Sequence, residues 1–487
     1  MNAYDYFFEN TFSLTKKFLV GREEITYREL HKCTLDLSEW IMEKVGENRK
    51  IFLVSPNNLF FLKVYLAVIK SGNICIPLDP NIEIKNFNYI NELTNPELIF
   101  ITSDVYKKLN LNIDIAIFPD KLDSIPTANR KPQTANPEQF DIDRCAEIIF
   151  TSGSTGEPKG VMISHKNLIA NTRSIVDYLK LTEDDRMMVV LPFYYCYGLS
   201  LLHTHLRIGG SIVFNNSFIF LGSVIKDMIE HKCTGFAGIP SHFQILLRKS
   251  DSFKQTRFPH MRYVTQAGGK LAPIFIDEFR QSHPEITFIV MYGQTEATAR
   301  LSWLPPELYE SKKGSIGKGI PDVILRVVNE NDEDIKPGET GEVIARGDNI
   351  MMGYFGDEAA TKKAIRNGWL YTGDLGTVDE DGYIFLTARS KEMIKVGGKR
   401  ISPKEIEAVI LHIPEVVDCT IEGIEDPIQG EALKATVVVR KGSLDKITED
   451  FIRHHCAQHL ALFKVPQFYL LKDELTITAT GKKIKKT

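Results

Sequence analysis

One segment rich in glycine and hydroxyl side chains, residues 148–165, constrains this chain more than any other stretch. It reads IIFTSGSTGEPKGVMISH, with apolar and β-branched runs on both sides of a loop. The loop holds three glycines, four hydroxyl side chains and one lysine, Lys159. Glycine lets a backbone wrap closely around a ligand, and amides, hydroxyls and an ammonium group all donate hydrogen bonds to an anion. The segment therefore predicts a β-hairpin whose loop binds phosphate.

Two other interpretations of this loop fit less well. A P-loop would carry the pattern G-x-x-x-x-G-K-[ST] and continue into a helix, whereas this loop lacks the pattern and continues into apolar strand residues. A solvated loop of glycine and serine would suit a shorter match, but this run is long and particular. Phosphate binding remains the best interpretation.

Composition limits the class of protein. The chain has 487 residues, of which 43% are hydrophobic and 25% charged, and its net charge is −4. This length predicts more than one domain, and this charge gives no reason to expect binding to nucleic acid or to an anionic membrane. We expect no membrane span and no signal peptide, because no apolar run is long enough and the N-terminus lacks a basic region before an apolar one. The seven cysteines are scattered without a C-x-x-C pair, which predicts free thiols and a cytoplasmic location.

Apolar runs alternate with amphipathic ones along the first part of the chain. Strands are expected at 51–55, 73–77, 97–102, 186–191 and 211–214, and helices at 58–69 and from about 168 to 179. Strands interleaved with helices predict parallel β-α units in a large layered α/β domain.

The pattern changes in the last third of the chain. Glycines, turns and short strands dominate from 338 to 381, and the charge density rises beyond 388. Ser402-Pro403-Lys404-Glu405 has the form of a capping box with proline at the first helical position, which predicts a helix over 403–411. We expect an N-terminal domain over 1–388, a hinge at 389–391 and a small mobile α+β domain over 392–487.

Residues 151–160 resemble the phosphate loop of the adenylate-forming superfamily, which includes acyl-CoA and aryl-CoA synthetases. Further segments resemble that family in the expected order, from 25–30 to 481–482. The resemblance implies a reaction in two steps: a carboxylic acid and Mg·ATP form an acyl-adenylate, and a thiol then displaces AMP. It implies ATP, Mg²⁺ and either CoA or phosphopantetheine on an acyl carrier protein as cofactors and partners. It also implies that the small domain rotates about Lys391 between the steps.

The same resemblance implies roles for individual residues. Thr295 would contact the α-phosphate, Glu296 would hold Mg²⁺, and Lys482 would neutralise charge on the reacting phosphate. Asp374 would accept both ribose hydroxyls, and Tyr292 would stack beside the purine. Segments 341–347 and 353–354 match the family with packing roles. The nucleotide-binding residues implied are Thr151, Ser152, Gly153, Ser154, Thr155, Gly156, Lys159, Ala267, Gly268, Gly269, Tyr292, Gly293, Gln294, Asp374 and Arg389.

Glycine and aromatic residues are implied at the two other ligand sites. Gly397 and Gly398 would let the backbone approach the pantetheine arm of the thiol substrate. The acid pocket would be lined by Tyr195, Tyr197, Phe236, Gly238 and Met291, which suits a fatty or aryl acid.

The chain departs from the family pattern at two positions of this pocket. Tyr195 stands where CoA ligases commonly carry histidine, which places the gating role of that histidine in doubt. Cys196 lies nearest to the position where amino-acid-activating domains carry aspartate. Free α-amino acids are therefore disfavoured, because their ammonium group would have no partner.

Three other functions stay open at the level of sequence. The chain could serve a carrier protein alone, as an acyl or amino-acid ligase, or it could oxidise the adenylate as luciferases do. It could also be a nucleotide-binding protein without catalysis, but such a protein could lose Glu296, Asp374 or Lys482, and all three are present. An acid–thiol ligase is the leading hypothesis.

Overall fold

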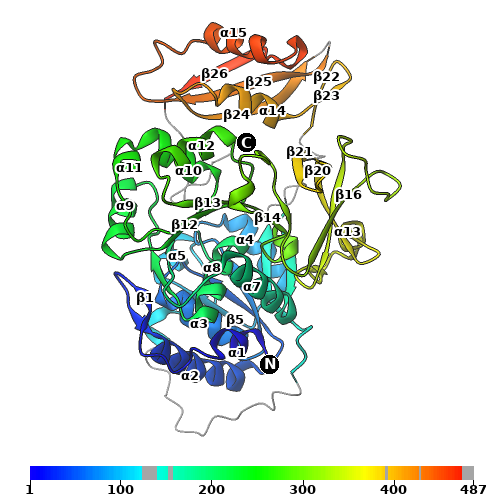
Figure 1. Ribbon diagram of the computed structural model, residues 1–487. Coiled ribbons are helices and arrows are strands. Elements are labelled where there is room, and N and C mark those ends of the chain that lie inside the picture. Colours follow the sequence, from blue (N-terminus) through cyan, green and yellow to red (C-terminus); the bar gives the residue numbers. More distant parts are fainter. Residues whose placement is uncertain (123–139, 152–156, 390–392, 427–428, 474–487) are drawn as a thin grey trace.

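Two bodies of unequal size make up the molecule. The computed structural model describes residues 1–122, 140–151, 157–389, 393–426 and 429–473 (Figure 1). In Figure 1 the small C-terminal body, drawn in orange and red, stands above the large body. Among the described residues, no helix is long and apolar enough to cross a membrane.

The first large sheet carries the predicted phosphate hairpin and has the strand order β18-β8-β7-β4-β3-β5-β6. The predicted strands near 51, 73 and 97 are confirmed, and they pair in parallel. The hairpin of β7 and β8 is antiparallel, and β18 adds to β8 at the edge. The strands are β3 (Lys50–Val54), β4 (Ile74–Leu78), β5 (Leu98–Ile101), β6 (Ala116–Ile117), β7 (Cys145–Thr151), β8 (Lys159–Ser164) and β18 (Gly353–Tyr354).

The second large sheet has the order β15-β14-β13-β12-β11-β9-β10-β1-β2. Strands β10, β9, β11, β12 and β13 are parallel, so their C-terminal ends meet at one edge. The strands are β1 (Lys17–Val20), β2 (Ile25–Thr26), β9 (Arg186–Val189), β10 (Ser211–Phe214), β11 (Gly235–Gly238), β12 (Tyr263–Gln266), β13 (Thr287–Tyr292), β14 (Ser302–Leu304) and β15 (Lys318–Gly319).

Helices form three layers around these two sheets. One core cluster joins β3 and β9 through α1 (Ala3–Phe8), α3 (Leu59–Lys70), α7 (His165–Leu179) and α8 (Cys196–Ile208), so these helices lie between the sheets. A second cluster covers the far face of the β9 sheet with α9 (Leu221–Glu230), α10 (Pro240–Lys249) and α12 (Pro273–Ser282). A third packs α4 (Ile84–Thr94) and α5 (Ser103–Lys108) on the other sheet. This arrangement confirms the predicted layered α/β domain.

The central helix α3 shows how local sequence begins such an element. Its N-cap is Asn58, whose side chain accepts a hydrogen bond from the amide of Phe61 at 2.8 Å. An N-cap of this kind satisfies one of the free amides of the first turn. Helix α2 (Tyr27–Val45) begins with a full capping box at Thr26 and packs against α3. The shorter helices are α6 (Pro119–Leu122), α11 (Asp251–Gln255) and α13 (Glu358–Ala364).

A third, antiparallel sheet completes the N-terminal body. It consists of β16 (Val323–Val328), β17 (Gly341–Gly347), β20 (Trp369–Val378), β19 (Ile365–Arg366) and β21 (Ile384–Arg389). Strands β17, β19 and β20 are among the short strands expected between 338 and 381, whereas β16 and β21 lie outside that range. Strand β21 ends at Arg389, where the sequence predicts the hinge to begin.

The small body is an α+β unit built on the order β23-β22-β25-β24, with β26 beside β25. Its elements are β22 (Ile394–Val396), β23 (Lys399–Ile401), α14 (Pro403–Ile410), β24 (Val416–Asp426), β25 (Gly430–Val439), α15 (Glu449–His459) and β26 (Phe468–Lys472). The predicted capping box before α14 is wrong: the Ser402 side chain caps no amide and instead donates to the carbonyl of Thr387 at 2.8 Å. A tertiary partner therefore outcompetes the local one.

One buried arginine joins the two bodies. Arg248 on α10 donates to the carbonyls of Leu411 and Ile413, each at 3.0 Å, and to that of Val416 in the small body. Its other guanidinium nitrogen pairs with Glu278 at 2.6 Å. The charge is thus fully compensated where the bodies meet.

Candidate functional site

The hairpin predicted at 148–165 is present, with Thr151 opposite Lys159 across its base. Packing also requires a glycine at position 160. A Cβ there would lie 2.9 Å from a methyl group of Ile148 and 3.0 Å from the ring of Phe150. The loop residues Ser152, Gly153, Ser154, Thr155 and Gly156 lie outside the described residues.

Strand β18 and the residues after it brace this hairpin. The amide of Phe355 donates to the carbonyl of Gly160 at 2.7 Å. Lys159 Nζ lies 3.0 Å from Asp357 Oδ2 and 5.2 Å from the centre of the Tyr354 ring. The predicted phosphate-binding lysine is therefore half-buried and held at a defined place by side chains about 200 residues later in the chain.

Asp374 is the centre of the predicted ribose site. It lies on β20 and is 4% exposed, and its two oxygens have separate partners. The hydroxyl of Tyr292, at the end of β13, donates to Oδ2 at 2.6 Å, and Arg389 Nε on β21 donates to Oδ1 at 2.9 Å. Burial, and then the charge of Asp374, raise the pKa of Tyr292 well above its usual value, so this hydroxyl remains a donor. The fold thus brings together three predicted residues from two sheets.

The turn after β13 presents Thr295 and Glu296. The hydroxyl of Tyr354 donates to Glu296 Oε1 at 2.9 Å, and Oε2 has no hydrogen-bond partner among the described residues. No group of three or more possible metal ligands occurs in the part of the chain that the structure describes. One carboxylate oxygen with the remaining ligands from phosphate and water suits Mg²⁺. Tyr354 was expected only to pack, and its contact with Glu296 could not be found from sequence because the two residues are 58 positions apart.

The segment after β12 suits the approach of a flat ring. Gly268 has a φ of +78°, and a Cβ there would lie 2.9 Å from Ile239. Gln266 Nε2 donates to the carbonyl of Gly269 at 2.7 Å and stabilises the turn. Gln294 follows Tyr292 by two positions. Its Nε2 is buried without a hydrogen-bond acceptor among the described residues. An unpaired buried amide of this kind fits a site completed by a polar ligand such as a nucleotide.

The predicted acid pocket is divided by the β9 sheet. Tyr197 and Met291 lie in the core cluster on the α8 side, and the hydroxyl of Tyr197 contacts Thr265 Oγ1 at 2.9 Å. Phe236 lies in the cluster on the other face, since it alternates with Ala237 along β11. Side chains of His242 and Phe243 fill the space at Gly238 on that same face. The structure therefore does not bring Phe236 and Gly238 to Tyr197 and Met291.

Tyr195 is half-buried at the N-terminal end of α8, and its neighbour Cys196 faces Thr295. The distance from Cys196 Sγ to Thr295 Oγ1 is 3.5 Å. Burial raises the pKa of the Cys196 thiol, which is therefore neutral at neutral pH. The position supplies no negative charge.

Arg300, which the sequence did not single out, contacts two residues of the predicted acid pocket. It is 2% exposed, and its guanidinium carbon lies 4.1 Å from the centre of the Tyr197 ring. Nε points at Met291 Sδ at 3.3 Å. The available signal was a second charged residue only four positions after Glu296.

The predicted thiol loop is the tight turn between β22 and β23. Gly397 and Gly398 have φ values of +53° and +79°, and no atom lies within 4 Å of a Cβ built at either position. Positive φ at both central residues is the requirement of a type I′ hairpin turn. The glycines thus serve the turn and leave its backbone open. The predicted hinge Lys391 and catalytic Lys482 lie outside the described residues.

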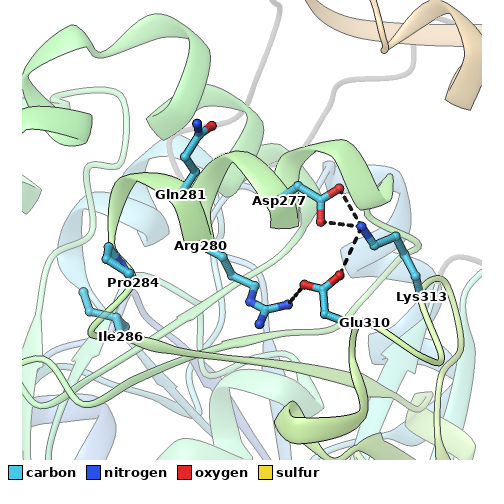
Figure 2. A pocket seen from close by; sticks show the side chains of 7 residues that line it. All are labelled: Asp277, Arg280, Gln281, Pro284, Ile286, Glu310 and Lys313. Carbon is cyan, nitrogen blue, oxygen red and sulfur yellow. Dashed lines mark hydrogen bonds and ion pairs between the residues drawn. The ribbon is translucent and has the colours of Figure 1, made fainter.

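A surface pocket of about 480 Å³ contains none of the predicted site residues (Figure 2). In this pocket Arg280 pairs with Glu310 at 2.6 Å, and Lys313 bridges Glu310 and Asp277 (Figure 2). Its charges neutralise one another across α12 and the 310–313 segment. The pocket is therefore separate from the site built around Asp374 and Glu296.

Comparison with known proteins agrees with this geometry. The family model of the AMP-binding enzyme matches residues 10–355, and that of the AMP-binding enzyme C-terminal domain matches residues 405–482. Oxalate–CoA ligase of Arabidopsis thaliana is 30% identical over 95% of this chain and 92% of its own length. Feruloyl-CoA synthase of Amycolatopsis sp. is 28% identical over 96% of this chain and 93% of its own.

Two solved structures extend the likeness to the whole fold. ATP-bound MatB from Rhodopseudomonas palustris has a TM-score of 0.85 and 26% identity, and covers 99% of this chain and 97% of its own. O-succinylbenzoate coenzyme A synthetase of Bacillus subtilis, solved with ATP and a magnesium ion, has a TM-score of 0.82 and 24% identity, over 98% of both chains. The predicted fold, with a large AMP-binding domain and a small C-terminal one, is confirmed.

These matches also confirm the predicted class of reaction, the AMP-forming ligation of a carboxylic acid to CoA. The first model alone spans well over half of the chain, and the Arabidopsis relative aligns over nearly all of it. The chain therefore belongs to the AMP-binding enzyme family, as an AMP-forming ligase of a carboxylic acid with CoA.

Proposed function

We propose that this ligase works through residues that the fold gathers around Asp374 and Glu296, in two half-reactions that share one site. The observation that carries the proposal is the meeting of Tyr292, Asp374 and Arg389 beside the turn of Thr295 and Glu296. These residues come from the large sheet and from the antiparallel sheet after it. A buried carboxylate with each oxygen held in place suits a ligand with two neighbouring hydroxyl donors.

The nucleotide would bind across this cluster. Asp374 accepts the two ribose hydroxyls, since each of its oxygens keeps a free lone pair beside the bonds from Tyr292 and Arg389. The open backbone at Gly268 and Gly269 lies against adenine, with the Tyr292 ring beside it. Gln294 Nε2, which is buried without an acceptor, donates to the nucleotide.

The phosphates would lie between the hairpin and the turn at Thr295. Lys159, Thr151 and the loop 152–156 hold the β- and γ-phosphates that leave as pyrophosphate, and Lys159 exchanges Asp357 for phosphate oxygen. Thr295 donates to the α-phosphate. A magnesium ion, when bound through Glu296 Oε2, supplies charge neutralisation for the phosphate oxygens.

In the first half-reaction, a carboxylate oxygen of the acid attacks the α-phosphorus. The bond from that phosphorus to the bridging oxygen breaks, and pyrophosphate leaves. Lys482, arriving from the small domain, stabilises the charge that accumulates on the α-phosphate. In the second, the thiol sulfur attacks the acyl carbon, the thiol proton is lost to solvent, and AMP leaves with the acyl–phosphate oxygen.

The second half-reaction would use the turn of Gly397 and Gly398 in the small domain. The backbone of Gly397 and Gly398 lines the path of the pantetheine arm, and rotation about Lys391 exchanges this turn for Lys482. The proposed domain bounds are therefore 1–388 and 392–487, with the hinge between them. Either CoA or a carrier-protein phosphopantetheine presents the same arm, and CoA is the proposed acceptor because the named relatives are CoA enzymes.

The acid is proposed not to be a free α-amino acid. The neutral thiol of Cys196 offers no charge partner for an ammonium group. A reducing compartment such as the cytoplasm fits the seven free cysteines.

The test is ATP–pyrophosphate exchange with a panel of fatty, aryl, dicarboxylic and amino acids, followed by analysis of products with CoA and with carrier protein. Exchange that depends on a carboxylic acid, and a thioester with CoA, are expected. No exchange with any acid would contradict the proposed ligase, and a thioester with carrier protein alone would replace CoA as the acceptor.

A further inference from the structure

We propose that Arg300 binds a second carboxylate of the acid substrate, so that this enzyme activates a dicarboxylic acid. The inference rests on the proposed function and names the class of acid that the site accepts. It replaces the purely apolar pocket expected from the sequence with one that contains a fixed positive charge.

Arg300 is buried without a counter-ion. Its side chain is among the largest that are fully buried, at 2% exposure, and a guanidinium keeps its charge at any physiological pH. No carboxylate of the described residues lies within 4.0 Å of it, since none of the ion pairs in that part of the chain includes Arg300. An unpaired buried charge costs several kcal/mol. A folded protein keeps such a group where a ligand supplies the opposite charge.

Arg248 provides the internal comparison. It is buried to the same degree, with a side-chain exposure of 1%, yet it pairs with Glu278 at 2.6 Å and donates to three carbonyls. Arg300 has no ion pair among the described residues, and the one backbone carbonyl that its guanidinium contacts there, that of Ala299, lies a long 3.4 Å away. Arg248 therefore has its counter-ion within the protein, whereas a counter-ion for Arg300 would have to come from a ligand.

The hydrogen-bond acceptors around Arg300 in the described chain are all uncharged, and one of them is the hydroxyl oxygen of Tyr178. Nε faces Met291 Sδ at 3.3 Å, and Nη1 lies a long 3.4 Å from the carbonyl of Ala299. The hydroxyl of Tyr178 points at the same sulfur at 2.9 Å. A thioether is a weak acceptor, so one sulfur serves two strong donors. A carboxylate that reached the guanidinium would be a far stronger acceptor than the sulfur, and the planar guanidinium suits it in the bidentate mode.

The backbone at Arg300 is also held in position. Asn349 Nδ2 donates to the carbonyl of Arg300 at 2.7 Å, and the amide of Leu301 donates to that of Tyr292 at 2.9 Å. Gly293 permits this tight return, since a Cβ there would lie 2.0 Å from the carbonyl of Ala299. The ring of Tyr197 supports the guanidinium from one side. Arg300 is thus fixed five residues after Thr295, among residues assigned to the acid and not to the phosphates.

The test compares matched acids in ATP–pyrophosphate exchange. Aliphatic and aryl dicarboxylic acids of graded length are each paired with their monomethyl ester and with the monocarboxylic acid of equal length. We expect the wild-type enzyme to prefer one diacid over its partners by about 100-fold or more in kcat/KM, because a site built for a polar group rejects the analogue that lacks it.

Arg300→Met should remove this preference, lowering kcat/KM for the diacid about 100-fold while changing that for the monoacid less than about threefold. Arg300→Lys should retain part of it, and Arg326→Met, at an exposed ion pair with Asp334, serves as the control. Equal use of diacid and monoacid by the wild type would overturn the inference even if no Arg300 variant folds. An equal loss for both acids in Arg300→Met would also overturn it, since that outcome assigns Arg300 to the reacting carboxylate. No exchange with any acid would instead remove the proposed function itself.

Discussion

The hydroxyl of Tyr354 donates a hydrogen bond to Glu296 Oε1 across 2.9 Å. Tyr354 belongs to the edge strand that pairs with the phosphate hairpin, and Glu296 belongs to the turn after β13. One contact therefore ties the proposed magnesium ligand to the hairpin proposed to hold the leaving phosphates. It also orients the carboxylate so that Oε2 remains available.

Tyr354→Phe should weaken the use of magnesium while keeping the ring beside Lys159. A hydrogen bond to a charged group contributes about 1.5–3 kcal/mol, so pyrophosphate exchange at low Mg²⁺ should fall roughly 10- to 100-fold. Excess Mg²⁺ should recover much of the loss. The measurement is exchange rate against Mg²⁺ concentration. Tyr383→Phe is the control, because that ring contacts Lys312 and Lys318 and its hydroxyl makes no hydrogen bond within the described chain. If the dependence of the exchange rate on Mg²⁺ concentration did not change, Tyr354 would have no role in the use of magnesium.

Asp374→Asn should impair recognition of the ribose. The wild type should prefer ATP over 2′,3′-dideoxy-ATP, because the ribose hydroxyls donate to Asp374. Removing the charge should weaken ATP binding by about 2 kcal/mol, roughly 30-fold, while affecting the dideoxy analogue much less. The measurement is a cycle of both proteins with both nucleotides in equilibrium binding. A wild-type enzyme that binds the two nucleotides equally would place the ribose elsewhere.

Lys482→Ala should separate the two half-reactions. Adenylation should fall roughly 10²- to 10³-fold, about 3–4 kcal/mol, because one charge-stabilising donor is lost. Thioester formation from a supplied acyl-adenylate should continue. Both steps are measured separately, and equal losses in both would contradict the use of two domain orientations.

Gly398→Val should have the opposite effect, reducing thioester formation and sparing adenylation. Valine at a φ of +79° strains the turn and adds bulk on the proposed thiol path. The matched control is Gly442→Val, at a φ of +81° with equally open surroundings in the same domain. If the two variants behaved alike, the loss would reflect backbone strain and not the thiol path.

Glu147 should make stability depend on pH. It is buried on β7 beside the hydroxyl of Tyr65, which also lies 2.8 Å from His203 Nε2. Burial raises the pKa of Glu147 from 4.5 to about 7 and lowers that of His203 to about 3. The Tyr65 hydrogen cannot serve both acceptors, so a proton on Glu147 satisfies the group.

The folded protein therefore binds more protons than the unfolded chain between pH 4.5 and about 7. The contribution of Glu147 to the free energy of unfolding is complete below that window. It is lost as the pH rises through the window, by roughly 3 kcal/mol in total. Glu147→Gln should abolish this part of the dependence. Denaturant unfolding of both proteins from pH 5 to 8 measures it. A difference in unfolding free energy that stays constant with pH would contradict the prediction.

Local patterns predicted much of this fold. The alternation of apolar residues located the parallel strands, Asn58 marked the start of α3, and the glycines of 148–165 predicted a hairpin. Each of these follows from interactions within a few residues. The capping box at Ser402 failed because its hydroxyl found the carbonyl of Thr387. A local preference such as helix capping is lost where a group distant in sequence offers a competing hydrogen bond.

The acid pocket shows the same limit more strongly. Phe236 and Tyr197 were equally good candidates by residue type, and only the pleat of β11 placed Phe236 on the far face of the sheet. Arg300 was passed over because the sequence does not show whether a charged side chain is buried or which groups it contacts. Its burial without a carboxylate is a property of several segments packed together.

The sequence by itself determined the class of enzyme, because the short runs that resemble the adenylate-forming superfamily can be recognised, in order, without the fold. Only the tertiary structure decided that Arg300 is buried without a carboxylate partner among the described residues. Whether a buried polar atom is paired depends on side chains far apart in the chain, and Tyr178, Met291 and Arg300 meet only when α7 packs on β13.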